Sequence, residues 1–245
     1  MDPLSEVLSL LTTQHSFFTG LKAGAEWAIA FPPPEGIKFN AVVKGECWLT
    51  VEGEAQPIRL EEGDCFLLSR RRAFALSSDP ALPMVASETV YRQMVNGIAL
   101  HGAADAFFLI GGRFAFGEEA RLLLDGLPPV AVIKRDASEA SVLRWALGRL
   151  AAEIASPSPG SSLLVQHMGH IMLVQFLRLY LSQETNQLPS WLRALSDVRI
   201  GRVIQAIHAA PAHRWTVARL AEVAGVSRST LALAFKQKAG VAPLD

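Results

Sequence analysis

The sequence predicts an α+β fold, with a β-rich N-terminal half arranged as a sandwich or jelly roll and a helical C-terminal half. Between residues 25 and 90, short apolar runs alternate with glycine, proline and acidic turns, which is typical of many short strands. From residue 138 onward, apolar residues recur at the spacing of one helix face. The chain has 245 residues, half of them hydrophobic, which is enough for one large or two modest globular domains.

The β-rich half begins after residues 1–11, which suit a short amphipathic helix. The run 27–31 predicts a strand, and three consecutive prolines at 32–34 stop it. Further strands are predicted at 39–43, 47–51, 58–60, 65–68, 74–76 and 106–110.

Two helices are predicted after residue 138. The second, at about 161–181, is apolar on nearly every side, so it must be buried, and a two-helix appendage cannot bury it alone. We therefore expect a homodimer through residues 143–181. His167, His170 and Arg178 interrupt this run, so we expect a buried helix with core or interface histidines and no membrane partner. The stripe of the first helix consists of Leu143, Ala146, Leu147, Leu150 and Ile154.

Charge is balanced over the whole chain but not along it. The 23 basic side chains match the 23 acidic ones, yet residues 199–240 carry seven basic side chains against Glu222 alone. That segment has a net charge of +6, which leaves −6 for the rest, and a basic end on an acidic body is typical of a phosphate-binding module. The N-terminus lacks a basic signal region and two cysteines give no disulfide framework, so we expect a cytoplasmic protein.

The C-terminal stretch 215–243 predicts two short helices joined by a tight turn. Thr216 is placed to cap the first helix, and Gly225 supplies the left-handed residue that ends it. Ser227 is placed to cap the second helix, whose Leu231 and Phe235 face back onto the first. Two such helices form a helix-turn-helix, which places its second helix in the DNA major groove; an ordinary antiparallel helix pair is the alternative.

This stretch resembles the first helix-turn-helix of the AraC/XylS-type transcription regulators. Leu231 stands where the family usually has phenylalanine. The residues that fit the family pattern are Trp215, Thr216, Val217, Leu220, Ala221, Ala224, Val226, Ser227, Phe235, Gly240 and Pro243.

The β-rich half is similar to the cupin-like sensor domain of one AraC subfamily, through residues 43–49, 60–68 and 127–130, the last interpreted as a loop after the barrel. The resemblance implies a cupin-like β-barrel (jelly roll) at 1–135, a helical dimerisation segment at 136–195 and a partial helix-turn-helix DNA-binding domain at 196–245. It also implies a ligand-responsive regulator that binds promoter DNA and an unknown small-molecule or redox effector.

The resemblance further implies that the second helix of the pair contacts DNA. At 100° per residue, the side opposite Leu231 and Phe235 carries Ser229, Leu233 and Lys236. The family usually has arginine at Leu233 and a second helix-turn-helix, whereas this chain ends after the first, so we expect weak DNA binding. The expected DNA-contacting residues are Thr216, Ser227, Arg228, Ser229, Thr230, Ala232, Leu233, Lys236 and Gln237.

A catalytic cupin holds a metal with two histidines and a glutamate on one strand pair and a histidine on a later strand. Asn40 stands where the first motif would have a histidine, and Ser69, Arg71 and Phe74 occupy positions of the second. The six histidines do not cluster in the predicted barrel. We therefore expect no metal, no cofactor and no enzymatic activity.

Cys47 and Cys65 lie in predicted strands, and two interpretations are open. They are either small buried side chains, as free cysteines often are, or a thiol sensor, which needs close Cα atoms and an exposed thiolate of low pKa. The arginines at 70–72 would lower a thiol pKa, bind an anionic ligand, or form solvated surface. The candidate sensing residues are Cys47, Cys65, Asn40 and Arg71. The alternative function is thus a redox or small-molecule sensing protein with a truncated DNA-binding domain that binds weakly.

Overall fold

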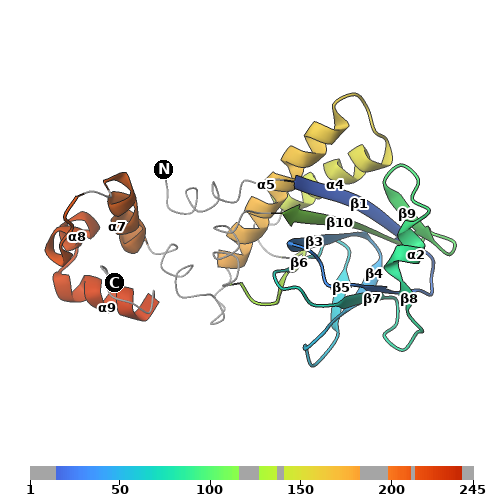
Figure 1. The fold of residues 1–245 in the computed structure, drawn as a ribbon, viewed down its shortest axis with the longest axis horizontal. Helices are drawn as coiled ribbons and strands as arrows, with labels where there is room; N and C mark the ends of the chain where they lie inside the picture. Colours follow the sequence, from blue (N-terminus) through green and yellow to red (C-terminus); the bar gives the residue numbers. More distant parts are fainter. Residues whose placement is uncertain (1–14, 116–126, 137–140, 183–197, 211–212, 239–245) are drawn as a thin grey trace. The chain divides into compact units, whose positions relative to one another are not determined.

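The computed structural model describes residues 15–115, 127–136, 141–182, 198–210 and 213–238 (Figure 1). Its contacts form two compact units. Two β-sheets and the helices α4 (Ser141–Ala155) and α5 (Ser161–Ser182) belong to one unit, which spans residues 13–116 and 129–182. The helices α7 (Val198–Ala209), α8 (Val217–Ala224) and α9 (Arg228–Lys238) belong to the other. The expected helix at residues 1–11 lies outside the described residues.

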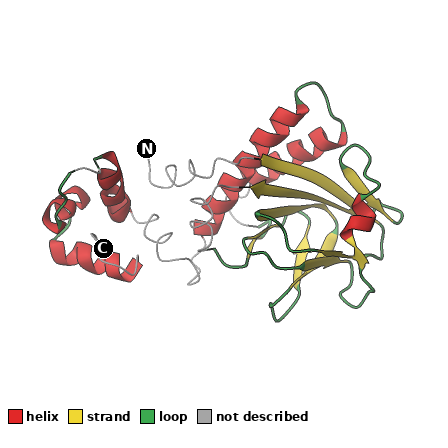
Figure 2. Ribbon diagram, in the orientation of Figure 1, coloured by secondary structure: helices red, strands yellow, loops and turns green. Residues whose placement is uncertain are grey.

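The two sheets pack face to face as a sandwich (Figure 2). The six-stranded sheet has the order β11-β6-β3-β10-β1-β9, and the five-stranded sheet has the order β5-β4-β7-β2-β8. The strands are β1 (His15–Ala23), β2 (Ala28–Phe31), β3 (Ile37–Lys44), β4 (Glu46–Val51), β5 (Ile58–Glu61), β6 (Cys65–Leu68), β7 (Phe74–Ser77), β8 (Val85–Ala86), β9 (Ile98–His101), β10 (Phe107–Ala115) and β11 (Val130–Ile133).

The expected sandwich or jelly roll is present, but it is not closed into a barrel, because both sheets keep open edges. At one end of the sandwich, the short helix α2 (Ser87–Tyr91) lies between the edge strands β8 and β9 and contacts both (Figure 1). It occupies the place where, in a closed barrel, these two strands would be joined by backbone hydrogen bonds. At the other end, the edge strands β5 and β11 are joined through side chains.

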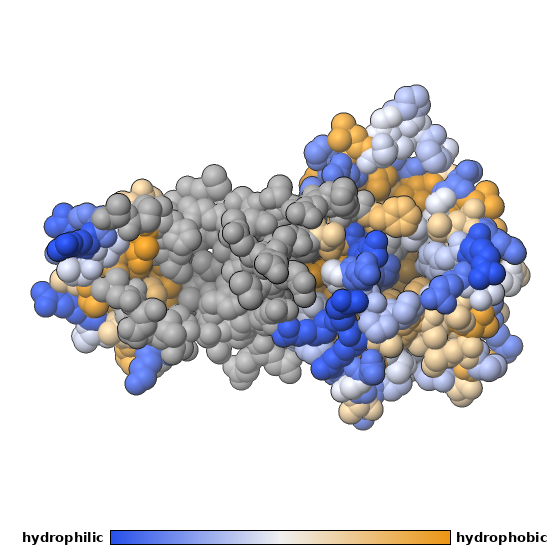
Figure 3. All heavy atoms as spheres, viewed as in Figure 1, coloured by the Kyte–Doolittle hydropathy of each residue, from blue (hydrophilic) through white to orange (hydrophobic). Residues whose placement is uncertain are grey.

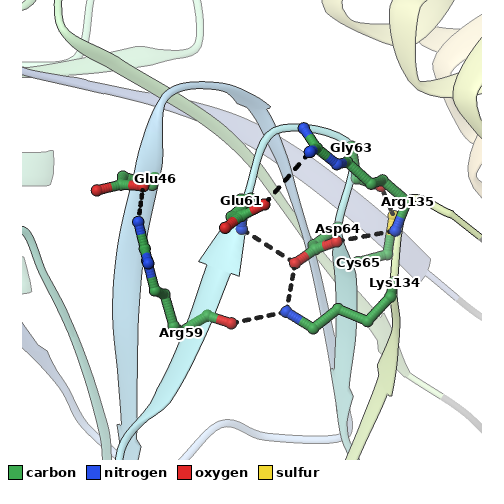
Figure 4. Close-up of polar contacts among 8 residues, drawn as sticks. All are labelled: Glu46, Arg59, Glu61, Gly63, Asp64, Cys65, Lys134 and Arg135. Carbon is green, nitrogen blue, oxygen red and sulfur yellow. Dashed lines mark hydrogen bonds and ion pairs between the residues drawn. The ribbon is translucent and has the colours of Figure 1, made fainter.

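Asp64 makes this second junction (Figure 4). Its carboxylate is buried and accepts hydrogen bonds from the backbone N–H groups of Glu61, at 3.0 Å, and Arg135, at 2.8 Å. Lys134 binds the same carboxylate at 2.7 Å and donates to the carbonyl oxygen of Arg59 at 2.8 Å. One carboxylate thereby holds the β5–β6 turn and the end of β11 together.

All the predicted strands are present, with ends shifted by one or two residues in most cases. The sequence missed β1, β8, β9 and β11, and residue 130 starts β11 instead of ending a loop. Strand β10 continues through Gly111 and Gly112 to Ala115. A Cβ atom on Gly112 would meet the ring of Phe18 on the neighbouring strand, so glycine here permits a close approach between strands.

The helices α4 and α5 pack on the outer face of the six-stranded sheet (Figure 1). Phe176 of α5 is fully buried and meets the ring of Phe39 on β3 edge-to-face, with centroids 5.9 Å apart. Gly169 lets α5 approach Phe18 of β1 closely, since a Cβ atom there would meet that ring. The sheet of the same chain therefore covers one side of the apolar α5, and the homodimer through residues 143–181 stays a prediction.

The side of the hairpin that the sheet does not cover still exposes apolar residues. In the space-filling view, apolar surface gathers over α5 (Figure 3). Trp145 of α4 is 64% exposed, and Leu163 and Ile171 of α5 are 58% and 42% exposed. Within the described ranges, no helix combines the length and continuous hydropathy that crossing a membrane requires.

Candidate effector pocket and candidate nucleic-acid interface

A cavity of about 530 Å³ opens between the two sheets of the sandwich. One wall is the inner face of β1, β3 and β10, and the opposite wall comes from β2, β7 and α2. The prolines 32–34, which follow β2, form part of the rim. Helix α2, which lies between the edge strands of the two sheets, therefore also forms part of the wall of this cavity. We call the cavity the sandwich pocket.

Two cations lie on the strand wall of the sandwich pocket. The register places Lys38 of β3 directly opposite Arg113 of β10, with Phe17 of β1 next in the same row. Burial, and after it the positive charge of Arg113, lowers the pKa of Lys38 to about 8. Arg113 pairs with Glu35 at 3.6 Å on the rim, and Glu35 is largely exposed.

The next row of the same wall holds a buried amide. Asn40 lies opposite Gly111, which in turn lies opposite Thr19 of β1. Asn40 is 1% exposed, and its Nδ2 group has no hydrogen-bond partner among the described residues. A Cβ atom on Gly111 would lie 2.8 Å from both Asn40 Oδ1 and Lys38 Nζ, so the glycine leaves room between these two side chains.

The opposite wall is aromatic. Phe31 stacks on Phe74 with ring centroids 4.6 Å apart and planes 3° apart, and Tyr91 of α2 meets Phe31 edge-to-face at 6.0 Å. Burial raises the pKa of Tyr91 to about 12, and a hydrogen bond with Thr19 partly offsets that effect. A molecule in the sandwich pocket would thus have cations and an amide on one side and aromatic rings on the other.

The structure opposes the thiol-sensor interpretation of Cys47 and Cys65. Cys47 is buried inside the sandwich, whereas Cys65 lies on the other face of the six-stranded sheet, because its neighbour Phe66 points inward. Burial, followed by the negative charge of Asp64, raises the pKa of both thiols, that of Cys47 to about 12. An acid, and not an arginine, is the main charged neighbour, so both residues fit the interpretation as small buried side chains.

Of the remaining sensing candidates, neither Asn40 nor Arg71 lines the sandwich pocket, but Asn40 lies beside Gly111, which does. Arg71 is exposed, while its neighbour Arg72 is paired with Glu54 at 2.9 Å. The residues at the cupin metal positions do not fit a metal centre, and in the described parts of the chain no three His, Cys, Asp or Glu side chains come together as one would need. The expectation of no metal and no cofactor stays a prediction.

The helices α7, α8 and α9 pack around a small apolar core of their own. The Trp215 indole N–H donates to the carbonyl oxygen of Ala210 at 3.1 Å, which links the residue before Thr216, the cap of α8, to the residue after α7. This core consists of Ile200, Val203, Leu220, Ala221, Ala224, Leu231 and Phe235.

The caps of α8 and the turn after it follow the sequence prediction. The Thr216 hydroxyl accepts a hydrogen bond from the backbone N–H of Arg219 at 3.3 Å. Gly225 has φ of 68°, and its N–H donates to the carbonyl oxygen of Glu222, so a left-handed glycine ends α8. The Ser227 hydroxyl accepts from the backbone N–H of Thr230 at 3.1 Å and thereby starts α9.

The outer face of α9 carries most of the expected DNA-contacting residues. Leu231 and Phe235 are buried, as predicted, and Leu233 is 56% exposed. Gln237 belongs to α9, but its side chain is outside the description. The exposed members of the expected set are Thr216, Ser227, Arg228, Ser229, Thr230, Ala232, Leu233 and Lys236.

The sequence reading missed the sandwich pocket, including Lys38, Arg113 and Tyr91. One local signal was present: Lys38 shares an alternating position with Asn40 and Val42, and a lysine in the inward register of a strand is unusual. The partners across the pocket gave no such signal, because they come from distant parts of the chain.

Comparison with known proteins gives the family. Residues 2–182 match the cupin family. The chain is 44% identical over its full length to an AraC-like transcription regulator of Streptomyces lividans and 42% identical to one of Streptomyces antibioticus, and it covers 81% of each. It is 25% identical to the HTH-type transcriptional regulator MtrA of Neisseria gonorrhoeae, over 99% of this chain and 80% of MtrA. These relatives are named as regulators and not as enzymes. The chain therefore belongs to the AraC-like transcription regulators, with a cupin domain over residues 2–182.

Proposed function

We propose that the protein is a ligand-responsive transcription regulator that binds promoter DNA through α9 and receives its effector in the sandwich pocket. The observation that carries the DNA-binding part is the capped pair α8 and α9, whose second helix presents an exposed polar and basic face in a chain of AraC-like descent. Fluorescence anisotropy of the purified chain with genomic DNA fragments tests this part directly.

The charge on α9 supports weak binding. Arg228 and Lys236 are exposed cations near its two ends, and Leu233 between them offers no hydrogen bond to a base edge. Phosphate contacts supply most of the non-specific affinity, so few cations mean few contacts. We expect a Kd of about 10⁻⁴–10⁻⁶ M at physiological salt.

Leu233→Arg is expected to tighten DNA binding, and Lys236→Ala is expected to weaken it and to lower the slope of log K against log salt by about 0.9. Anisotropy titrations between 50 and 200 mM salt measure both effects, which is roughly the range where such slopes are resolved. Arg71→Ala, which removes an exposed cation of the sandwich unit, serves as the control and should leave the slope unchanged. If the chain bound an operator with nanomolar affinity and Lys236→Ala left that affinity unchanged, α9 would present a different face to the DNA.

A homodimer through residues 143–181 is the second part of the proposal. Trp145, Leu163 and Ile171 form an exposed apolar surface on the α4–α5 hairpin, and such surfaces in soluble proteins are typical of interfaces. An effector that shifts the population between two dimer geometries would change the spacing of the two DNA-binding helices.

Sedimentation at micromolar concentration is expected to show a dimer, and the double variant Trp145→Asp/Ile171→Asp is expected to sediment as a monomer with unchanged helix content, because each change places a charge on the interface. A wild-type monomer with intact helices would contradict the dimer.

A further inference from the structure

We propose that the sandwich pocket binds a small organic anion, a carboxylate carried on an apolar or aromatic body, with Lys38, Arg113 and Asn40 as its polar partners. That this anion is the effector rests on the function proposed above; the binding chemistry does not.

The strand wall carries two adjacent positive charges that are only partly compensated by carboxylates in the described part of the chain. Lys38 and Arg113 lie directly opposite each other on antiparallel strands, and like charges in that position destabilise a sheet. Arg113 pairs with the exposed Glu35 on the rim, and an exposed pair of this kind contributes little. The structure gives Lys38 no carboxylate partner in the described part of the chain. An anion placed between the two cations would stabilise both.

Asn40 adds a hydrogen-bond donor in the adjacent row. Buried polar groups are nearly always paired, and an unpaired buried donor is destabilising, so the free Nδ2 group of Asn40 needs an explanation. Gly111 leaves space beside the Asn40 side chain, because a Cβ atom there would lie 2.8 Å from Asn40 Oδ1 and from Lys38 Nζ. A carboxylate has two oxygens that accept from several donors at once, whereas a neutral hydroxyl cannot balance two cations.

The rest of the ligand is set by the aromatic wall. A cavity of about 530 Å³ is much larger than a carboxylate group and lies within the range of organic-ligand sites. Phe31, Phe74 and Tyr91 would cover an apolar body on the side away from the charges. An inorganic anion such as phosphate would satisfy the cations and leave this wall without a partner.

Binding should depend on pH through Lys38, whose pKa in the empty pocket is about 8. An anion favours the protonated amine, so it raises that pKa, and binding takes up a proton near pH 8. Affinity is then constant below about pH 7 and falls, by up to about tenfold per pH unit, above pH 8. The other charged groups that line the pocket are Arg113, Glu35 and Glu88. The pKa of Tyr91 is raised to about 12, so it stays neutral in this range.

Calorimetry of the full chain with octanoate and 4-phenylbutyrate, their uncharged amides, and inorganic phosphate tests the proposal. At pH 7 we expect at least one carboxylate to bind at least tenfold tighter than its amide and than phosphate. Lys38→Met and Gly111→Ala should each weaken that carboxylate at least tenfold, and Lys38→Met should remove the pH dependence. Arg71→Met, a cation outside the pocket, should bind as wild type. Circular dichroism checks that each variant is folded.

The proposal is overturned if neither carboxylate binds, if the amides bind as tightly as the acids, or if Lys38→Met binds undiminished. Failure of the proposed function looks different: a carboxylate binds through Lys38 but leaves the DNA affinity and the dimer unchanged. A DNA response to octanoate that persists in Lys38→Met would support the regulator and refute this pocket chemistry.

Discussion

Asp64→Asn is expected to lower the free energy of unfolding of the sandwich by about 3 kcal/mol, the cost of disrupting a buried, charge-assisted hydrogen-bond cluster. Asp64 is 1% exposed, and every group that contacts its carboxylate is a donor: two backbone N–H groups and the ammonium of Lys134. An amide has one acceptor oxygen, so its NH₂ group would face a donor whichever way it turns. The lost hydrogen bonds would destabilise the end of the sandwich where the edge strands β5 and β11 are joined.

Urea unfolding followed by tryptophan fluorescence measures this change, because Trp27 and Trp48 belong to the same sandwich. Glu62→Gln is the matched control, since Glu62 is an exposed acid in the same turn and should change stability by no more than about 0.5 kcal/mol. Lys134→Met should cost less than Asp64→Asn, because the Lys134 side chain is half exposed. If Asp64→Asn and Glu62→Gln had equal free energies of unfolding, the hydrogen-bond cluster around Asp64 would not be what joins β5 to β11.

Phe176→Ala is expected to destabilise the sandwich unit by about 3–5 kcal/mol, the usual cost of removing a fully buried phenylalanine. Phe176 contacts Phe39 of the sheet edge-to-face and stacks on Tyr180 of its own helix at 6.4 Å. The ring therefore joins α5 to the six-stranded sheet, and its loss would leave a cavity between the two layers.

The two layers should unfold together. Circular dichroism, to which α4 and α5 contribute the most helical residues among the described helices, and tryptophan fluorescence, to which Trp48 of the five-stranded sheet contributes, are expected to shift to the same lower midpoint in Phe176→Ala. Leu100→Ala, an exposed apolar residue on β9, is the control and should shift neither. Helices that melt first while the sheet signal stays at the wild-type midpoint would mean that the hairpin is only an appendage.

The sequence predicts what is local and misses what depends on distant strands. Thr216 and Gly225 act on backbone groups within a few residues, so their caps could be predicted without the structure. Strand β1 could not, because Thr19 and Gly20 interrupt its apolar residues. Gly20 is tolerated since the ring of Phe108 takes the space of its side chain, 2.9 Å from where a Cβ atom would be.

The same distinction explains the candidate sites. The face of α9 follows from helical spacing alone, so its exposed and buried residues could be assigned from sequence. The sandwich pocket depends on which strands are neighbours: Lys38 and Arg113 are far apart in the chain, and only the register of β3 with β10 brings them together. The arginines at 70–72 were conspicuous in sequence, yet the exposed Arg71 lies outside the cavity.

The position of β1 in the six-stranded sheet has a consequence for the order in which the molecule folds. β1 is hydrogen-bonded to β10 on one side and to β9 on the other, so among the described strands it has no partner until residues 98–115 have been synthesised. Long-range pairings of this kind close large loops and form slowly, in milliseconds to seconds for typical β-sandwiches. The α7–α9 contacts span short stretches of chain and should form faster. On the ribosome, β1 should therefore remain unpaired for a long time, which makes it a segment of the nascent chain that needs chaperone protection.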